Sequence, residues 1–454
     1  MSVVLIIGLF CLLAGLLIAF KALAAPPAEK AARPRAAVVL FSHFPEDARP
    51  RREAEALIHA GFDVELICLQ RDRSEQLREE LPGLVVYRVP LRRKRNGKLS
   101  YVLLYGVFFL AAATFLGVRA LRGYRLVHVH NMPDILVFSA LLPRLFGARI
   151  LLDLHDPMPE LFQAIYKLPE ESCSVGLLKR IEHAAIRFSD AVLTPNVAFK
   201  DLFASRGAPP QKVNIVMNSP DEALFNMKAA DQSQPLPGLN VAFHGTLVER
   251  NGLGLAVEAV GLLAPRLPEL RLHIFGEQTG YSQEVFRRVA EMKLENVIHY
   301  HGFKPLNEVP ASIAQMDFGL VPNVDNVFTR INLPTRILEC LSMGKPPVAP
   351  RTRGVLDYFQ EKDLIFFEPG NAHDLANQLE WAYRHPEEVA AILRRGRQVY
   401  ERHRWVDERG KFVEIARKLG RLADAAEGSL EKLPFESVPP LAKRDKAASA
   451  KGSA

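Results

Sequence analysis

A stretch that begins at Asn332 contains residues with clear chemical potential. It reads NLPTRILECLSMGKPPVA, which predicts a short helix leading into a buried strand. Asn332 suits the helix cap and Pro334 suits the first turn, while Gly344 suits a left-handed exit. Arg336 and Glu339 lie three residues apart and therefore share one helix face. Such a face can bind a polar ligand, or the two side chains can pair as a surface salt bridge.

A glycine loop precedes this helix in the sequence. Residues 243–252 read FHGTLVERNG and lie between a predicted strand and a predicted helix. Glycine lets the backbone approach an anion closely, and the amino end of a helix favours negative charge. Arg250 adds a fork of donors suited to a diphosphate. A tight turn with a solvated arginine is the alternative interpretation. Gly276 and Gly302 end two further strands and are predicted pocket walls, although Gly276 also fits a simple left-handed strand exit.

Polar residues end strands in the first half of the chain as well. Residues 152–160 read LDLHDPMPE, which places His155, Asp156 and Glu160 directly after an apolar strand. Burying such groups is costly unless they serve a site or satisfy one another. Asn131 follows the preceding strand in the same way. These side chains are candidates for a second binding surface.

The loop at residues 42–53, SHFPEDARPRRE, concentrates charge after the first strand. Arg49 and Arg52 are suited to an anionic acceptor such as a lipid diphosphate, with Asp47 orienting them. The alternative is a charged helix start in which Asp47 lies near the positive end of the helix dipole.

Apolar strands alternate with helical patterns along most of the chain, as in parallel sheets covered on both faces. The expected strands are residues 37–41, 64–68, 85–89, 126–130, 150–154, 191–194 and 213–217, then 240–244, 270–275, 297–301, 318–321, 347–349 and 364–367. We therefore predict an α/β protein with two doubly wound Rossmann-like domains, residues 36–225 and 238–422, facing a cleft. Residues 424–454 have little apolar content and are predicted to be disordered.

Two apolar runs raise the question of a membrane. The 454-residue chain carries a net charge of +7, with basic residues clustered at 92–98 and in the tail. Residues 3–20 are uncharged, and positive charge follows but does not precede them, which predicts a transmembrane helix within residues 1–24 and the remaining domains in the cytoplasm. A cleaved signal peptide is the alternative. The second run, residues 101–118, fits either a helix lying on the membrane or an ordinary buried helix. The basic cluster lacks interleaved aromatic residues, so we expect membrane lipids as partners and no nucleic acid.

The helix and the glycine loop together resemble the family 4 glycosyltransferases of the GT-B fold, over about residues 36–422. The resemblance implies a retaining transferase of the cytoplasmic (inner) membrane that moves a hexose-type sugar from a nucleotide-diphosphate sugar to a glycan or lipid-linked acceptor, without cofactor or metal. It implies that Glu339 positions the nucleotide, Arg250 stabilises the leaving diphosphate and His155 supports the sugar. It further implies a donor site containing Gly245, Thr246, Asn251, Gly276, Gly302, Phe303, Asn332, Leu333, Pro334, Thr335 and Arg336, and an acceptor side containing Asp47, Arg49, Arg52, Asn131, Asp156 and Glu160.

Three positions depart from the family pattern. Thr246 and Asn251 stand where an arginine and a lysine usually bind the donor phosphates, and Ile331 replaces the first of two glutamates spaced eight apart. Two other functions therefore stay open. A sugar-nucleotide epimerase on the same fold would need no acceptor, and a catalytically silent scaffold of polysaccharide assembly would need no donor chemistry.

Overall fold

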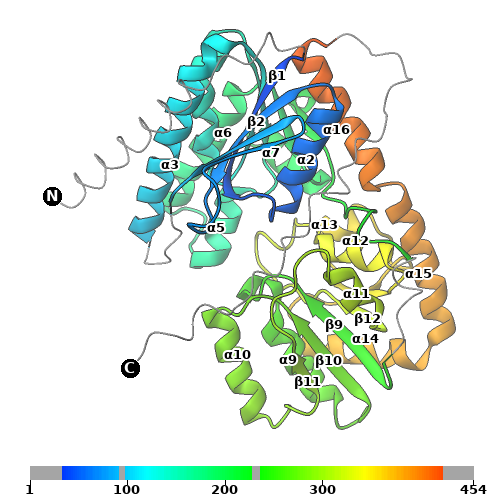
Figure 1. Ribbon diagram of the computed structural model, residues 1–454. Helices are drawn as coiled ribbons and strands as arrows, with labels where there is room; N and C mark the ends of the chain where they lie inside the picture. Colours follow the sequence, from blue (N-terminus) through cyan, green and yellow to red (C-terminus); the bar gives the residue numbers. More distant parts are fainter. Residues whose placement is uncertain (1–32, 92–97, 228–235, 423–454) are drawn as a thin grey trace. The chain divides into compact units, whose positions relative to one another are not determined.

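The computed structural model describes residues 33–91, 98–227 and 236–422 (Figure 1). The predicted membrane anchor, most of the basic cluster, most of the linker between the two strand series and the predicted disordered tail lie outside the described residues.

The first half of the chain forms an eight-stranded sheet with the order β3-β4-β2-β1-β5-β6-β7-β8. The strands are β1 Arg35–His43, β2 Asp63–Leu69, β3 Arg78–Leu81, β4 Leu84–Val89, β5 Tyr124–His130, β6 Arg149–Asp153, β7 Ala191–Thr194 and β8 Val213–Ile215. The helices are α2 Ala48–His59, α3 Lys98–Arg119, η1 Ala120–Arg122, η2 Asp134–Ala140, α4 Leu141–Leu145, α5 Met158–Tyr166, α6 Cys173–Phe188, α7 Val197–Ser205 and η3 Pro210–Lys212. Neighbouring strands are parallel except β3, which pairs antiparallel with β4.

Helices cover both faces of this sheet, which explains why its strands read as continuous apolar runs. Alternate residues such as Val127 and Val129 pack with α3, η2 and α6 in one core cluster. On the opposite face lie α2 and the last helix, α16, which run beside each other (Figure 1). His128 and His130 point to that second face, where His128 meets Phe412 of α16.

The second half forms a six-stranded sheet with the order β11-β10-β9-β12-β13-β14, in which all neighbours are parallel. The strands are β9 Leu239–His244, β10 Leu270–Phe275, β11 Ile298–Tyr300, β12 Phe318–Leu320, β13 Pro347–Pro350 and β14 Ile365–Phe367. The helices are η4 Glu249–Asn251, α9 Leu253–Leu263, α10 Gly280–Glu291, α11 Val309–Ala314, α12 Thr335–Ser342, α13 Arg353–Leu356, α14 Ala372–Arg384, α15 Pro386–Glu401 and α16 Trp405–Gly420. Helices α9 and α14 pack on one face, and α12 packs on β12, β13 and α15.

All the strands predicted from the sequence are present, and one further strand, β3, occurs as well. Strand β3 was not predicted because its sequence, REEL, has no apolar face, and it pairs through a hairpin turned by Gly83 at φ 72°. The segment between β5 and β6 does not form one continuous α-helix, because the 3₁₀ helix η2 is followed by the short helix α4. Pro143 explains this, because it cannot donate the helical hydrogen bond and its ring crowds the preceding turn.

The start of α12 also differs from prediction. The helix begins at Thr335, Pro334 occupies the cap position in an extended conformation, and the side chain of Asn332 does not cap it. A proline disfavours the helical conformation of the residue before it, here Leu333, so the helix cannot start earlier. The left-handed exit at Gly344 is confirmed by its φ of 68°.

Helix α3 is neither fully buried nor fully exposed. Within the described residues, the stretch Val102–Arg122 is long and apolar enough to cross a membrane by length and composition alone. Phe108 and Phe115 of α3 are buried against the sheet. Val102 and Leu110, in contrast, are 66% and 57% exposed. The helix therefore has a sheet-facing side and an apolar outer side.

Gly252 allows a test of the close packing around the glycine loop. It has φ 77°, and a Cβ atom there would lie 1.6 Å from the carbonyl oxygen of Pro322. We expect Gly252→Ala to lower the free energy of unfolding by at least about 2 kcal/mol, because the backbone must move and the left-handed conformation is strained. Urea denaturation measures this change. Gly410→Ala is the control, since Gly410 lies in helix α16 with open space around it; equal stability of the two variants would contradict the packing described here.

Candidate functional site

Glu339 lies on α12 and faces the end of β9. Its Oε2 atom is 2.7 Å from Nε2 of His244, the last residue of that strand. The His244 side chain is 5% exposed and that of Glu339 is 16% exposed. The alternative of a surface salt bridge between Glu339 and Arg336 is not seen, because the partner of Glu339 is the histidine.

Arg336 extends from α12 towards the glycine loop. Its guanidinium donates to Oδ1 of Asn323 at 2.6 Å and lies over the ring of Phe243. A Cβ atom on Gly245 would be 3.7 Å from Cδ of Arg336, so this side chain lines the loop. Burial lowers the pKa of Arg336 to about 10, although the charge of Glu339 opposes this. The side chain is thus a buried cation bonded mainly to neutral groups.

Arg250 provides a second cation at the same loop. Burial lowers its pKa and the charge of Asp156 opposes that change, while the charge of Arg250 in turn helps to lower the pKa of Arg336. Among the described residues, neither Arg250 nor Arg336 has an acidic partner within ion-pair distance. The loop therefore holds two partly or fully buried positive charges without a bound carboxylate.

The backbone of the loop is fixed by close contacts. Gly245 has φ 112° and donates its N–H to Phe275. The Asn251 amide donates to the carbonyl of Thr246 at 2.8 Å, so Asn251 braces the loop while Thr246 is exposed. Gly276 does not have the left-handed conformation; a Cβ there would lie 2.1 Å from the carbonyl oxygen of Gly245. Gly276 is therefore needed for close approach.

The remaining residues predicted for the donor side lie at a strand end and at the start of α12. Gly302, with φ 77°, and Phe303, 60% exposed, follow β11. Leu333 is buried, and Thr335 accepts a hydrogen bond from the amide of Asn218 at 3.2 Å. Phe303 thus presents an aromatic face to solvent.

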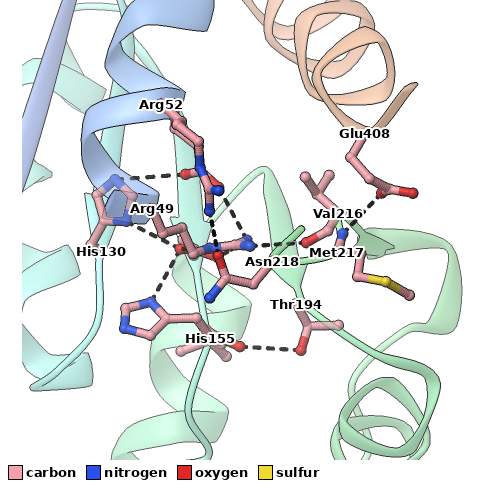
Figure 2. A network of polar contacts seen from close by, with 12 residues as sticks. Arg49, Arg52, His130, His155, Thr194, Val216, Met217, Asn218 and Glu408 are labelled. Atoms are coloured by element: carbon pink, nitrogen blue, oxygen red, sulfur yellow. Dashed lines mark hydrogen bonds and ion pairs between the residues drawn. The ribbon is translucent and has the colours of Figure 1, made fainter. Parts of the chain in front are cut away.

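A network of charged side chains lies at the carboxyl ends of β5 and β6 in the first sheet (Figure 2). Arg49 of α2 binds both oxygens of Asp153 at 2.8 Å and also donates to the carbonyl of Val216. Nδ1 of His155 and Nδ1 of His130 each lie 3.1 Å from Oδ2 of Asp153. The pKa of Asp153 lies well below its usual range, because Arg49 and the histidines outweigh the opposing effect of burial.

His155 is the most accessible member of this network. Burial lowers its pKa, but the hydrogen bond and charge of Asp153 outweigh burial, and the net pKa is raised to about 9. Its side chain is 24% exposed, whereas that of Asp153 is fully buried. At neutral pH, His155 is therefore an imidazolium held by a buried carboxylate.

The two arginines predicted for an acceptor lie inside the protein. Arg49 and Arg52 are each 4% exposed. Arg52 donates to Oδ1 of Asn218 (Figure 2). It also donates to the carbonyl of Ser219, and its guanidinium lies over the ring of Trp405. Asp47 occupies the cap position of α2 without a capping hydrogen bond from its side chain, and the hydrogen-bond partners of Arg49 and Arg52 are other residues. Both guanidinium groups therefore form their hydrogen bonds with other residues of the protein and not with an open surface.

Asn131, Asp156 and Glu160, which were also predicted for the acceptor side, differ in their burial and partners. Asn131 is buried, donates to the carbonyl of Asp156 at 2.6 Å and accepts from the N–H of His155 at 3.2 Å. It therefore fixes the loop that carries both residues. Asp156 is half-buried, and burial raises its pKa despite His155 and Arg250. Glu160 is buried and paired with Arg206, away from open surface.

Two groups of described residues bring potential metal ligands together: Glu53, His128 and His130, and His130, Asp153 and His155. Arg49 already supplies a cation to both, because it binds Asp153 and lies 3.1 Å from Glu53. The charge of the two buried carboxylates is thus balanced within the network, and we assign the network a positioning role.

Sequence reasoning missed His244, Asn323 and Asp153 as members of these sites. The signal for His244 and Asp153 was a polar residue at the last position of a mostly apolar strand. Such a residue is costly to bury without a partner. Asn323 gave no comparable signal, because only the fold brings it to Arg336.

Comparison with known proteins agrees with this architecture. Residues 47–219 match the glycosyl transferase 4-like domain, and residues 238–385 match the glycosyl transferases group 1 domain. The amylovoran biosynthesis glycosyltransferase of Erwinia amylovora is 27% identical over 37% of this chain and 42% of its own length. The chain spans about half the length of the first curated relatives it matches.

Two solved structures have the same fold. Sucrose-phosphate synthase from Thermosynechococcus elongatus has a TM-score of 0.70 at 18% identity, over 86% of this chain and 100% of that one. Anabaena HepE, solved in complex with UDP, has a TM-score of 0.62 at 16% identity, over 85% and 100% of the two chains. The predicted GT-B architecture is confirmed, and the chain belongs to the family 4 glycosyltransferases.

The pair of His155 and Asp153 makes stability depend on pH. Because the pKa of His155 rises from 6.5 to about 9 on folding, the pair stabilises the protein fully below pH 6.5 and loses this effect as pH rises through 9. We expect the difference in unfolding free energy between wild type and His155→Gln to fall by about 1–3 kcal/mol between pH 6.5 and 9.5. Denaturation at both pH values measures it. The exposed His373→Gln is the control, and a difference independent of pH would contradict the assignment.

Proposed function

We propose that this protein is a retaining glycosyltransferase that moves a hexose-type sugar from a nucleotide-diphosphate sugar to a glycan or lipid-linked acceptor. The observation that carries this proposal is the pair of guanidinium groups, Arg250 and Arg336, beside one glycine loop. No acidic side chain among the described residues forms an ion pair with either. A diphosphate is a fitting partner, because guanidinium groups bind phosphate oxygens through two parallel hydrogen bonds.

The two arginines also compensate for the departures from the family pattern. Thr246 and Asn251 bring no charge, but Arg250 lies one position before Asn251 and Arg336 reaches the loop from α12. Two fixed cations at the leaving diphosphate provide the electrostatic stabilisation for which other transferases use a metal ion. We therefore propose that the reaction is independent of metal.

The roles in the reaction follow from this arrangement. The bond between the anomeric carbon and the diphosphate breaks while Arg250 and Arg336 hold the developing negative charge. The acceptor hydroxyl forms the new bond on the same face of the sugar and gives its proton to the departing phosphate oxygen. The imidazolium of His155, held by Asp153, supports the sugar, and Glu339 binds the ribose. Phe303 offers an exposed ring against which a nucleobase can stack.

The nucleotide and the pathway are proposed from the relatives. HepE was solved with UDP, which makes UDP-sugars the first donors to test. The relative from Erwinia is named for amylovoran biosynthesis, which supports a role in polysaccharide assembly.

We further propose that the first sheet's outer apolar surface lies on the cytoplasmic membrane, with residues 1–24 as an anchor. Helix α3 packs against η1, η2 and α4, and these elements, with the C-cap residue of α4, carry exposed apolar side chains. These are Val102, Leu103, Leu110, Leu121, Ile135, Leu141, Leu142, Leu145 and Phe146. The sequence before α3 carries Arg92, Arg93, Lys94 and Arg95, which suit anionic headgroups. A lipid-linked acceptor would be reached at such a surface.

Donor chemistry is tested with a panel of nucleotide sugars and membrane extracts, with products identified by mass spectrometry. We expect transfer that persists in EDTA and falls roughly 10²–10³-fold in Arg250→Ala and Arg336→Ala, because each removes a charged donor to the leaving group. Glu339→Ala is expected to raise KM. Arg287→Ala on α10 is the control, because that arginine is exposed and remote in sequence from the loop.

Other outcomes separate the competing functions. An epimerised nucleotide sugar without acceptor would indicate an epimerase. Failure to bind any nucleotide would indicate a scaffold. Unchanged transfer in Arg250→Ala and Glu339→Ala would refute the donor site.

Membrane contact is tested with a polarity-sensitive dye on full-length Leu145→Cys, in a background that carries Cys11→Ser and Cys173→Ser. We expect a blue shift of dye emission on reconstitution into vesicles with anionic lipid, because Leu145 is 72% exposed on the apolar surface. Met292→Cys, at the exposed residue that follows α10, is the control, and equal emission at the two positions would argue against membrane contact by α4.

A further inference from the structure

We propose that His244 is a positioning residue for Glu339, and that this pair makes the donor site selective for ribonucleotides over 2′-deoxyribonucleotides. The inference rests on the proposed function, because it assigns the ribose as the ligand of Glu339. It goes beyond that function by naming the group that orients the carboxylate and the substrate feature that the pair recognises.

The geometry of the pair fixes one carboxylate oxygen and leaves the other available. Nε2 of His244 donates to Oε2 of Glu339 at 2.7 Å, since an ionised carboxylate only accepts. Among the described residues, no hydrogen bond to Oε1 of Glu339 is formed, and this atom is not among the buried unsatisfied ones. Glu339 therefore presents a single oxygen whose direction is set by the histidine.

Both partners sit on rigid elements. His244 pairs in register with Phe275 of β10, and its N-terminal neighbours pair with β12. Glu339 lies in the middle of α12, which packs on β12 and β13. The hydrogen bond thus links the strand that leads into the glycine loop to the donor helix, and it limits the rotation of a glutamate side chain that is otherwise flexible.

No neighbouring basic side chain of α12 takes the place of His244 as the partner of Glu339. Arg336 is the nearest basic residue on α12, but its guanidinium is directed to Asn323 and over the ring of Phe243. At the position of the missing first glutamate, Ile331 packs partly buried against the apolar cluster that contains Phe328. The donor helix therefore offers one carboxylate for the hydroxyl groups of the donor, so its orientation decides how they are bound.

The other ring nitrogen of His244 argues against a purely structural role. Nδ1 is buried and has no hydrogen-bond partner among the described residues. An apolar side chain would fill this strand end without leaving a polar atom unsatisfied, so packing alone does not account for a histidine here. Its hydrogen bond to Glu339 does account for it.

This arrangement has a consequence for ligand selection. A carboxylate oxygen held in place accepts hydrogen bonds from neighbouring ribose hydroxyls, and a site built for a hydroxyl rejects the analogue that lacks it. Without His244, the Glu339 side chain can rotate towards solvent, and the preference of the site for a ribose with both hydroxyl groups weakens.

The test is calorimetric titration of the full-length protein with UDP and 2′-deoxy-UDP, or with the diphosphate pair of whichever base the donor panel identifies. We expect wild type to bind the ribonucleotide at least about tenfold more tightly, and His244→Phe to reduce this ratio towards one. His244→Gln is expected to restore the ratio in large part, because its amide can donate to Glu339. The exposed His373→Phe is the matched control.

The outcomes separate this inference from the proposed function. If wild type binds no nucleoside diphosphate, the proposed function itself fails. If wild type binds and discriminates but His244→Phe keeps the same ratio, only the role of His244 is overturned. Should His244→Phe not fold, His244→Asn takes its place, because asparagine fits the same space but is too short to reach Glu339; an unchanged ratio there overturns the inference as well.

Discussion

A guanidinium group removed from water needs an anion or a full set of acceptors, and this protein meets that requirement differently in its two sheets. At the end of the first sheet, Arg49 is matched by Asp153 and Glu53. At the end of the second, Arg250 and Arg336 have no carboxylate within ion-pair distance among the described residues. In the first arrangement the charges are paired within the protein and His155 is held in place; in the second, the negative charge would come from the nucleotide-diphosphate donor that we propose.

This difference explains how the chain can depart from its family at three positions. The glycine loop has no charge at Thr246 and Asn251, but it contains Arg250 in η4, and Arg336 of α12 reaches it. The donor helix lacks an acid at Ile331, yet Glu339 gains a fixed partner in His244. Arg250 belongs to the loop itself, whereas Arg336 and His244 come from α12 and β9, which the fold brings beside the loop and the helix.

Elements with a strong local sequence pattern were predicted correctly, and elements with a weak pattern were missed. Buried parallel strands such as β7 and β10 were located from their continuous apolar runs, and Gly344 from its place after a helix. The charged edge strand β3 was missed because its pairing partner, not its own sequence, makes it a strand. Asn332 was wrong as a cap because the restriction that Pro334 places on Leu333 outweighs its capping preference.

The sequence by itself determined the alternation of strands and helices, the two sheets and the glycine loop with its arginine, because period, turn residues and burial are local properties. Only the tertiary structure decided which charges are already paired. Arg49 and Arg250 look alike in sequence, yet Arg49 meets a carboxylate 104 residues away, whereas Arg250 meets none within ion-pair distance in the described chain. His244 likewise reaches Glu339 across 95 residues. Such partners are set by strand order and helix packing, which bring distant residues within a few ångströms.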